Sequence, residues 1–91
     1  MSGGFVGMDP DQIDSVAAQF GQKAGEVDGI KSALEGQVNS TSGSWKGTDA
    51  ETFRNNWPTF RQQLDTLSTA LRDLDKALRN QATQQRDISM Q

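Results

Sequence analysis

The chain has few side chains that could carry out a reaction. It contains no His and no Cys, so the commonest general base, the usual metal ligands and any thiol nucleophile are missing. Acids that lie close together in sequence are Asp9, Asp11 and Asp14, and later Asp73 and Asp75. Acids on adjacent helical turns, without a glycine loop, are ordinary caps and surface charges. We therefore expect no catalytic residue, no cofactor and no metal, and the protein is not predicted to be an enzyme.

The basic residues do not indicate a nucleic-acid or phosphate site. The net charge is -3, and the cations of the second half alternate with acids instead of clustering. These cations are Arg54, Arg61, Arg72, Lys76, Arg79 and Arg86. We interpret them as solvated charges with some ion pairing between helices. Nucleic acid is therefore not an expected partner. No apolar stretch approaches the length of a membrane span, so stable membrane insertion is not expected either.

The positioning elements are two helices. Asp9 is a suitable N-cap, Pro10 suits the first helical position, and Gln12 completes a capping box. Apolar residues then recur every seven positions, which predicts a helix over about 9–38. They are Ile13, Phe20, Val27 and Leu34. The segment 39–48 is rich in Asn, Ser, Thr and Gly, and is predicted to be a turn.

The second helix, over about 49–82, has the more regular pattern. Apolar residues alternate by four and three, as in the a/d positions of a coiled coil. They are Phe53, Trp57, Phe60, Leu64, Leu67, Leu71, Leu74 and Leu78. After Leu78 the pattern fades, so 83–91 is predicted to be a flexible tail, as is 1–8 at the other end. Pro58 is expected to kink or break the helix.

The two apolar stripes match each other when the chain folds back on itself. A turn centred near Gly43 predicts an all-α, antiparallel two-helix hairpin with a shared core. The facing core pairs are Leu34 with Phe53, Val27 with Phe60, Phe20 with Leu67, and Ile13 with Leu74. The same register predicts the flanking ion pairs Glu26–Arg61 and Asp11–Lys76.

A single hairpin has a small core, which predicts association with another hairpin. Only 33% of the residues are hydrophobic, and small cores usually need oligomerisation. The back of the first helix carries small residues that permit close approach of another helix. This glycine ridge consists of Ala18, Gly21, Gly25 and Gly29. It is either a dimer contact or a solvent-facing surface, and the residues alone leave both interpretations open.

The turn contains Trp45-Lys46-Gly47, and the positions after it follow a wider pattern. That pattern is Trp45-x-Gly47-x-Asp49-Ala50-x-x-Phe53-Arg54-x-x-Trp57. Together with the length and the two helices, it resembles the Trp-X-Gly (WXG) family. These are early-secreted-antigen-like substrates of type VII secretion in Actinobacteria and Firmicutes. The wider pattern resembles the actinobacterial branch.

The resemblance implies a hairpin that pairs with itself or a sister protein as a four-helix bundle. It implies folding in the cytoplasm and export as a folded dimer, without a cleaved signal peptide, by a type VII secretion ATPase. The first residues agree, since Met1 to Gly7 lack the charged and apolar regions of an ordinary signal peptide. Trp45 and Gly47 would then cap the bundle and also form half of the export signal.

One part of the family pattern is missing. The family signal also uses Tyr-x-x-x-Asp/Glu after the second helix, whereas this chain has no Tyr. The nearest match, Thr83 to Asp87, has the acid without the aromatic ring. A partner could supply the Tyr motif. The alternatives are an intracellular dimeric helical adaptor that is never exported and a membrane-active effector, the latter opposed by the polar composition.

Overall fold

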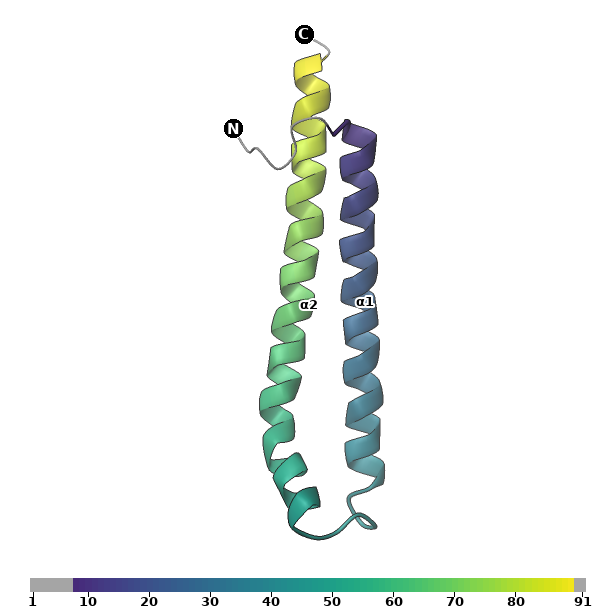
Figure 1. Cartoon of the computed structure of the whole chain (residues 1–91), viewed down its shortest axis with the longest axis vertical. Coiled ribbons are helices and arrows are strands. Elements are labelled where there is room, and N and C mark those ends of the chain that lie inside the picture. Colours follow the sequence, from purple (N-terminus) through teal and green to yellow (C-terminus); the bar gives the residue numbers. More distant parts are fainter. Residues whose placement is uncertain (1–7, 90–91) are drawn as a thin grey trace.

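The computed structural model describes residues 8–89, which form two long antiparallel helices (Figure 1). Helix α1 spans Pro10–Ser40 and helix α2 spans Thr48–Ser89. The Cα atoms fill 66 × 20 × 15 Å with a radius of gyration of 19.5 Å. A globular chain of this length would have a radius of gyration of about 12 Å. The all-α antiparallel hairpin is therefore confirmed, and it is a thin rod instead of a globule.

Local signals set the start of α1. Asp9 accepts a hydrogen bond from the Gln12 amide at 2.8 Å, and the Gln12 side chain accepts one from the Asp9 amide at 3.0 Å. This capping box satisfies two amide groups that a helix start would otherwise leave unpaired. The predicted tail 1–8 lies outside the described residues except for Met8, which packs against the hairpin.

Helix α2 extends seven residues beyond the end that the sequence predicts. Beyond Ala82 it continues to Ser89, although 83–91 was expected to be flexible. The extension is held by Arg86, whose guanidinium lies 2.7 Å from Asp11 and 2.9 Å from Asp14 on α1. Residues 90 and 91 lie outside the described part of the chain. Ion pairs between the helices thus continue the contact beyond the end of the apolar pattern.

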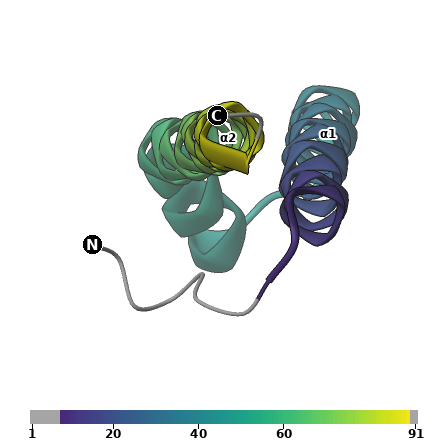
Figure 2. The same ribbon diagram turned by 90° about the horizontal axis from the view of Figure 1, so that it is seen from above.

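Pro58 does not break α2. The helix is continuous through this residue, while its first turns lie off the axis of the remainder (Figure 2). A proline inside a helix removes one backbone donor and crowds the preceding turn, which explains a bend at this place. Within residues 8–89, neither helix combines the length and the apolar character that crossing a bilayer requires.

The register of the hairpin differs from the predicted one. Ile13 packs with Leu78 and Ala82, not with Leu74. Likewise, the predicted ion pairs are wrong, because Arg61 pairs with Glu35 and Asp11 pairs with Arg86. Helix α2 is therefore displaced along α1 by roughly one to three helical turns relative to the prediction.

The displacement has a physical reason, which is that small residues line the contact between the helices. We call this contact the seam; its buried residues are Ile13, Ala17, Ala24, Ser68, Leu78 and Ala82. Small side chains let two helix backbones approach closely, and the Ser68 hydroxyl donates to the Ala24 carbonyl at 3.5 Å. The large residues of the a/d pattern consequently lie beside the seam.

Several residues predicted for the hairpin core are therefore not in it. Ile13, Trp57 and Leu78 are buried, whereas Phe20, Val27, Phe53, Leu64 and Leu71 are half-buried. Four others are exposed within the single chain, namely Leu34, Phe60, Leu67 and Leu74. The predicted stripe is thus buried or half-buried at eight of its twelve positions and exposed at four.

Candidate functional site

The connecting turn is a compact, hydrogen-bonded unit. The Thr41 carbonyl accepts hydrogen bonds from the amides of Ser44, at 3.1 Å, and Trp45, at 2.9 Å. Gly47 has a φ of 111°, a left-handed conformation that a side chain would disfavour. Its carbonyl accepts the Glu51 amide at 3.1 Å, so α2 starts directly from this glycine. The Trp-x-Gly spacing thus places a large ring two residues before the glycine at which the chain turns into α2.

Trp45 lies on the outside of this turn. Its ring centroid is 5.7 Å from that of Phe53, which is in turn 6.3 Å from that of Trp57. Trp57 is buried, whereas Trp45 remains 41% exposed. One side of the Trp45 ring therefore packs on the hairpin, and the other is available to a partner.

Arg54 is the residue that ties the turn to α2. Its Nη2 donates to the Thr41 carbonyl at 2.9 Å and also to the Trp45 carbonyl. Its guanidinium carbon lies 5.8 Å from the centroid of the Trp45 ring, within the range of a cation–π contact. The prediction that Arg54 is a solvated cation is therefore wrong. No residue type marks its acceptors, because every residue has a backbone carbonyl.

One open face of the hairpin is apolar. At about 100° per residue, large side chains of both helices fall on the same side of the seam. We call this side the apolar face; it comprises Val16, Phe20, Val27, Ile30 and Leu34 of α1, and Phe60, Leu64, Leu67, Leu71 and Leu74 of α2. The most exposed members of the α2 row are Phe60 at 44%, Leu67 at 47% and Leu74 at 46%. This row is uncovered in the single chain.

The apolar face also contains a hollow. It is lined by Val16, Gln19, Phe20 and Lys23. These positions have the i, i+3, i+4, i+7 spacing of the four residues that receive a side chain in knobs-into-holes packing. The hollow can therefore accept one apolar side chain from another helix.

The opposite face is closed by ion pairs between the helices, and we call it the ion-paired face. Its nitrogen–oxygen distances are 2.6 Å for both Asp28–Arg72 and Lys31–Asp65, 3.2 Å for Glu35–Arg61, and 2.9 Å for Asp14–Arg86. All these side chains are at least partly exposed. Each pair is consequently worth only about 0–1 kcal/mol.

These pairs shift three ionisation equilibria. Hydrogen bonds from Arg72, and then from Ser68, hold the pKa of the Asp28 carboxyl below its usual value. The hydrogen bond to Asp65 raises the pKa of Lys31, and hydrogen bonds to Asp11 and Asp14 raise that of Arg86. All three shifts favour the charged forms that make the pairs.

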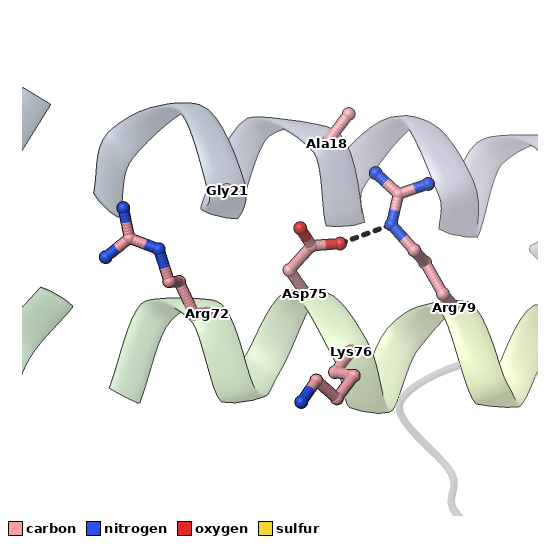
Figure 3. A pocket seen from close by; sticks show the side chains of 6 residues that line it. All are labelled: Ala18, Gly21, Arg72, Asp75, Lys76 and Arg79. Atoms are coloured by element: carbon pink, nitrogen blue, oxygen red, sulfur yellow. Dashed lines mark hydrogen bonds and ion pairs between the residues drawn. The ribbon is translucent and has the colours of Figure 1, made fainter. Parts of the chain in front are cut away.

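The predicted glycine ridge belongs to this second side. Gly21 and Ala18 border a shallow hollow together with Arg72, Asp75, Lys76 and Arg79 of α2 (Figure 3). Asp75 points between the helices and bonds to Arg79 at 2.5 Å, while Lys76 points away from α1. A Cβ on Gly21 would lie 2.6 Å from Asp75 Oδ2, whereas Cβ atoms on Gly25 and Gly29 would meet open space. The ridge stays a prediction as a dimer contact.

The C-terminal end of α2 has no feature that replaces the missing tyrosine. Thr83 to Asp87 are helical, and Arg86 is engaged with α1. Ile88 is 70% exposed beyond the start of α1. Across residues 8–89, no three acidic side chains are grouped closely enough to hold a metal ion.

Comparisons with known proteins agree with this geometry. The family described as WXG100, proteins of 100 residues with WXG, matches residues 6–88. EsxA of Geobacillus thermodenitrificans superimposes with a TM-score of 0.85 at 22% identity, and the match covers 91% of each chain. At that identity the likeness concerns the fold alone.

A second solved structure is somewhat closer in sequence. It is the secreted protein EsxB of Bacillus anthracis strain Sterne, with a TM-score of 0.81, 26% identity, and coverage of 90% of this chain and 93% of that chain. No curated protein matches. Since these structures come from Geobacillus and Bacillus, they lend no support to the predicted actinobacterial branch.

Proposed function

Because the chain belongs to the WXG100 family, we propose that it is exported by a type VII secretion system as a folded dimer and acts by binding other proteins. Proteins of this family are non-enzymatic secreted helical hairpins. One observation carries the proposed dimer, namely the apolar face that the two helices leave uncovered.

The apolar face supports association because it has the size and pattern of half a bundle core. Burying the remaining exposed surface of Leu67 or Leu74 would stabilise a complex by about 1 kcal/mol for each side chain. The hollow beside Phe20 offers a place for one apolar side chain of a partner. Stacking two such faces would give a four-helix bundle.

The partner is either a second copy of this chain or a sister hairpin. Six of the nine cations pair with acids of the same chain, so few charges are left to select a partner. Shape and apolar contact would then decide the pairing. A sister bearing the Tyr motif would supply the part of the export signal that this chain lacks.

The turn supports the second element of the proposal, recognition by the secretion ATPase. Trp45 is held outward on a rigid reversal at Gly47 and is partly exposed. An exposed aromatic ring on a fixed backbone is a common anchor in protein recognition. Export would then need no cleaved signal peptide, because the signal belongs to the folded protein.

A secretion assay in the native host tests the proposal. Deletion of the type VII ATPase should abolish the protein from the culture medium while it accumulates in the cells. Trp45→Ala should also prevent export, whereas Lys46→Ala, at the variable position of the motif, should not. Unchanged extracellular amounts after deletion would contradict export by this system, whereas a wild-type protein found only inside the cells would favour the intracellular dimeric adaptor.

A further inference from the structure

We propose that Arg54 is the positioning residue that fixes Trp45 at the tip of the hairpin, in advance of any partner. Its side chain reaches from α2 to both ends of the turn, donating from one nitrogen to the carbonyls of Thr41 and Trp45. The consequence for recognition rests on the proposed function of the turn. The positioning itself concerns the isolated chain.

Arg54 supplies a donor that the turn backbone does not. Among the described residues the Trp45 carbonyl accepts no backbone amide, whereas the Thr41 carbonyl already accepts two. The Thr41 and Trp45 carbonyls both point to the gap between the turn and α2, where Arg54 meets them. A planar guanidinium carries its donors in a fixed geometry, so one side chain can hold two acceptors at once.

Arg54 and Phe53 together hold the indole ring. Phe53 lies 5.7 Å from the Trp45 ring, and the Arg54 guanidinium lies 5.8 Å from it. These are consecutive residues in the first turns of α2, so both depend on the same short stretch of helix. The ring orientation is therefore set by α2 and not by the turn alone.

One nitrogen of the Arg54 guanidinium is buried. The Arg54 Nε is buried without a partner among the described residues, which is a cost that a freely solvated arginine would avoid. A side chain that accepts this cost while making two hydrogen bonds and a ring contact is held in a specific place. Arg61, two turns further along α2, is exposed and makes an ordinary surface pair with Glu35.

Amide exchange and NMR on the purified chain test the proposal. In Arg54→Met, which keeps the length and helix propensity but not the donors, the Trp45 amide should exchange at least about tenfold faster. Its indole signal should move as the guanidinium leaves the ring. Arg54→Lys, which keeps the charge and a donor, should raise the Trp45 amide exchange rate less than Arg54→Met does, and should move the indole signal less. Arg61→Met is the matched control and should change neither.

The amides of the seam serve as an internal reference. They should exchange at the wild-type rate in both variants, because the seam does not contact Arg54. If the Trp45 amide and indole are unchanged in Arg54→Met, the positioning role is wrong. If Arg54→Met unfolds, Arg54→Lys decides, and wild-type exchange at Trp45 together with an unmoved indole signal would overturn the proposal. These measurements need no secretion system, so they stand apart from failure of the export assay.

Discussion

The apolar face and the ion-paired face flank the same seam, but only the ion-paired face is complete within one chain. On that face, acids of α1 meet cations of α2 at 2.6–3.2 Å. On the apolar face, Phe60, Leu67 and Leu74 are nearly half exposed. The ion pairs are individually weak, whereas each apolar side chain gains energy only when something covers it. One face therefore contributes weak pairs within the chain, and the other holds apolar surface that a partner can bury.

The largest expected effect is the loss of association when a charge enters the apolar face. Leu67→Asp would bury an unpaired carboxylate at the centre of the row, and should weaken a dimer on the order of 100-fold or more. Light scattering over a concentration series measures this. Thr69→Asp, exposed on the same helix away from this row, should leave the dissociation constant nearly unchanged. Equal dimerisation of both variants would contradict the comparison of faces.

The second effect concerns the glycine ridge, where the two assignments of the interface predict opposite results. Cβ atoms at Gly25 and Gly29 meet open space, so Gly25→Ala and Gly29→Ala should each stabilise the chain by about 0.5–1 kcal/mol. Urea unfolding measures the gain. If the ridge is a dimer contact instead, the added methyl groups will separate the helices and lower the apparent affinity.

A smaller difference is expected between two glycines of that ridge. The Cβ of Gly21→Ala would lie 2.6 Å from Asp75 Oδ2, so the carboxylate must move and weaken its bond to Arg79. The variant should therefore gain less stability than Gly25→Ala, by roughly 0.5 kcal/mol. Repeating both substitutions in an Asp75→Ala background should remove the difference. Equal gains in the presence of Asp75 would show that the contact has no effect.

The smallest effect is the pH dependence of one ion pair. The pKa of Asp28 is lowered in the folded chain by Arg72, so its contribution is complete above the unfolded value of about 3.9. It is lost as the pH falls through the folded value. Asp28→Asn should therefore melt slightly below the wild type at pH 7, and the gap should close in acid. Asp73→Asn, which breaks no ion pair among residues 8–89, should show no such closing gap.

The sequence predicted what depends on neighbouring residues. The capping box at Asp9 and Gln12, the helical character of both segments and the turn around Trp45 and Gly47 all follow from short-range patterns. Two adjacent stripes competed for the helix–helix contact, however. The heptad residues are large and easily recognised, while the seam combines two of them, Ile13 and Leu78, with alanines and Ser68, which carry little hydrophobic signal.

The register of the two helices and the contacts of Arg54 with the turn could not be predicted for similar reasons. The sequence alone permits an ion pair of Arg61 with Glu26 or with Glu35. Only the packing of small residues decides in favour of Glu35. Arg54 binds backbone carbonyls, which every residue has, so its partners leave no trace in the sequence. The extension of α2 past Ala82 depends on Arg86 meeting acids at the far end of the chain.

The start of α1 and the end of α2 lie at the same end of the rod, opposite the turn (Figure 1). Tension applied to these ends therefore loads the contacts between the helices one after another, as in unzipping, and not all together, as in shearing. The ion pair of Arg86 with Asp11 would break first, and the hydrogen bond of Arg54 to the Trp45 carbonyl would bear the force last. A force pulling these two ends apart would therefore meet a series of small resistances instead of one large one.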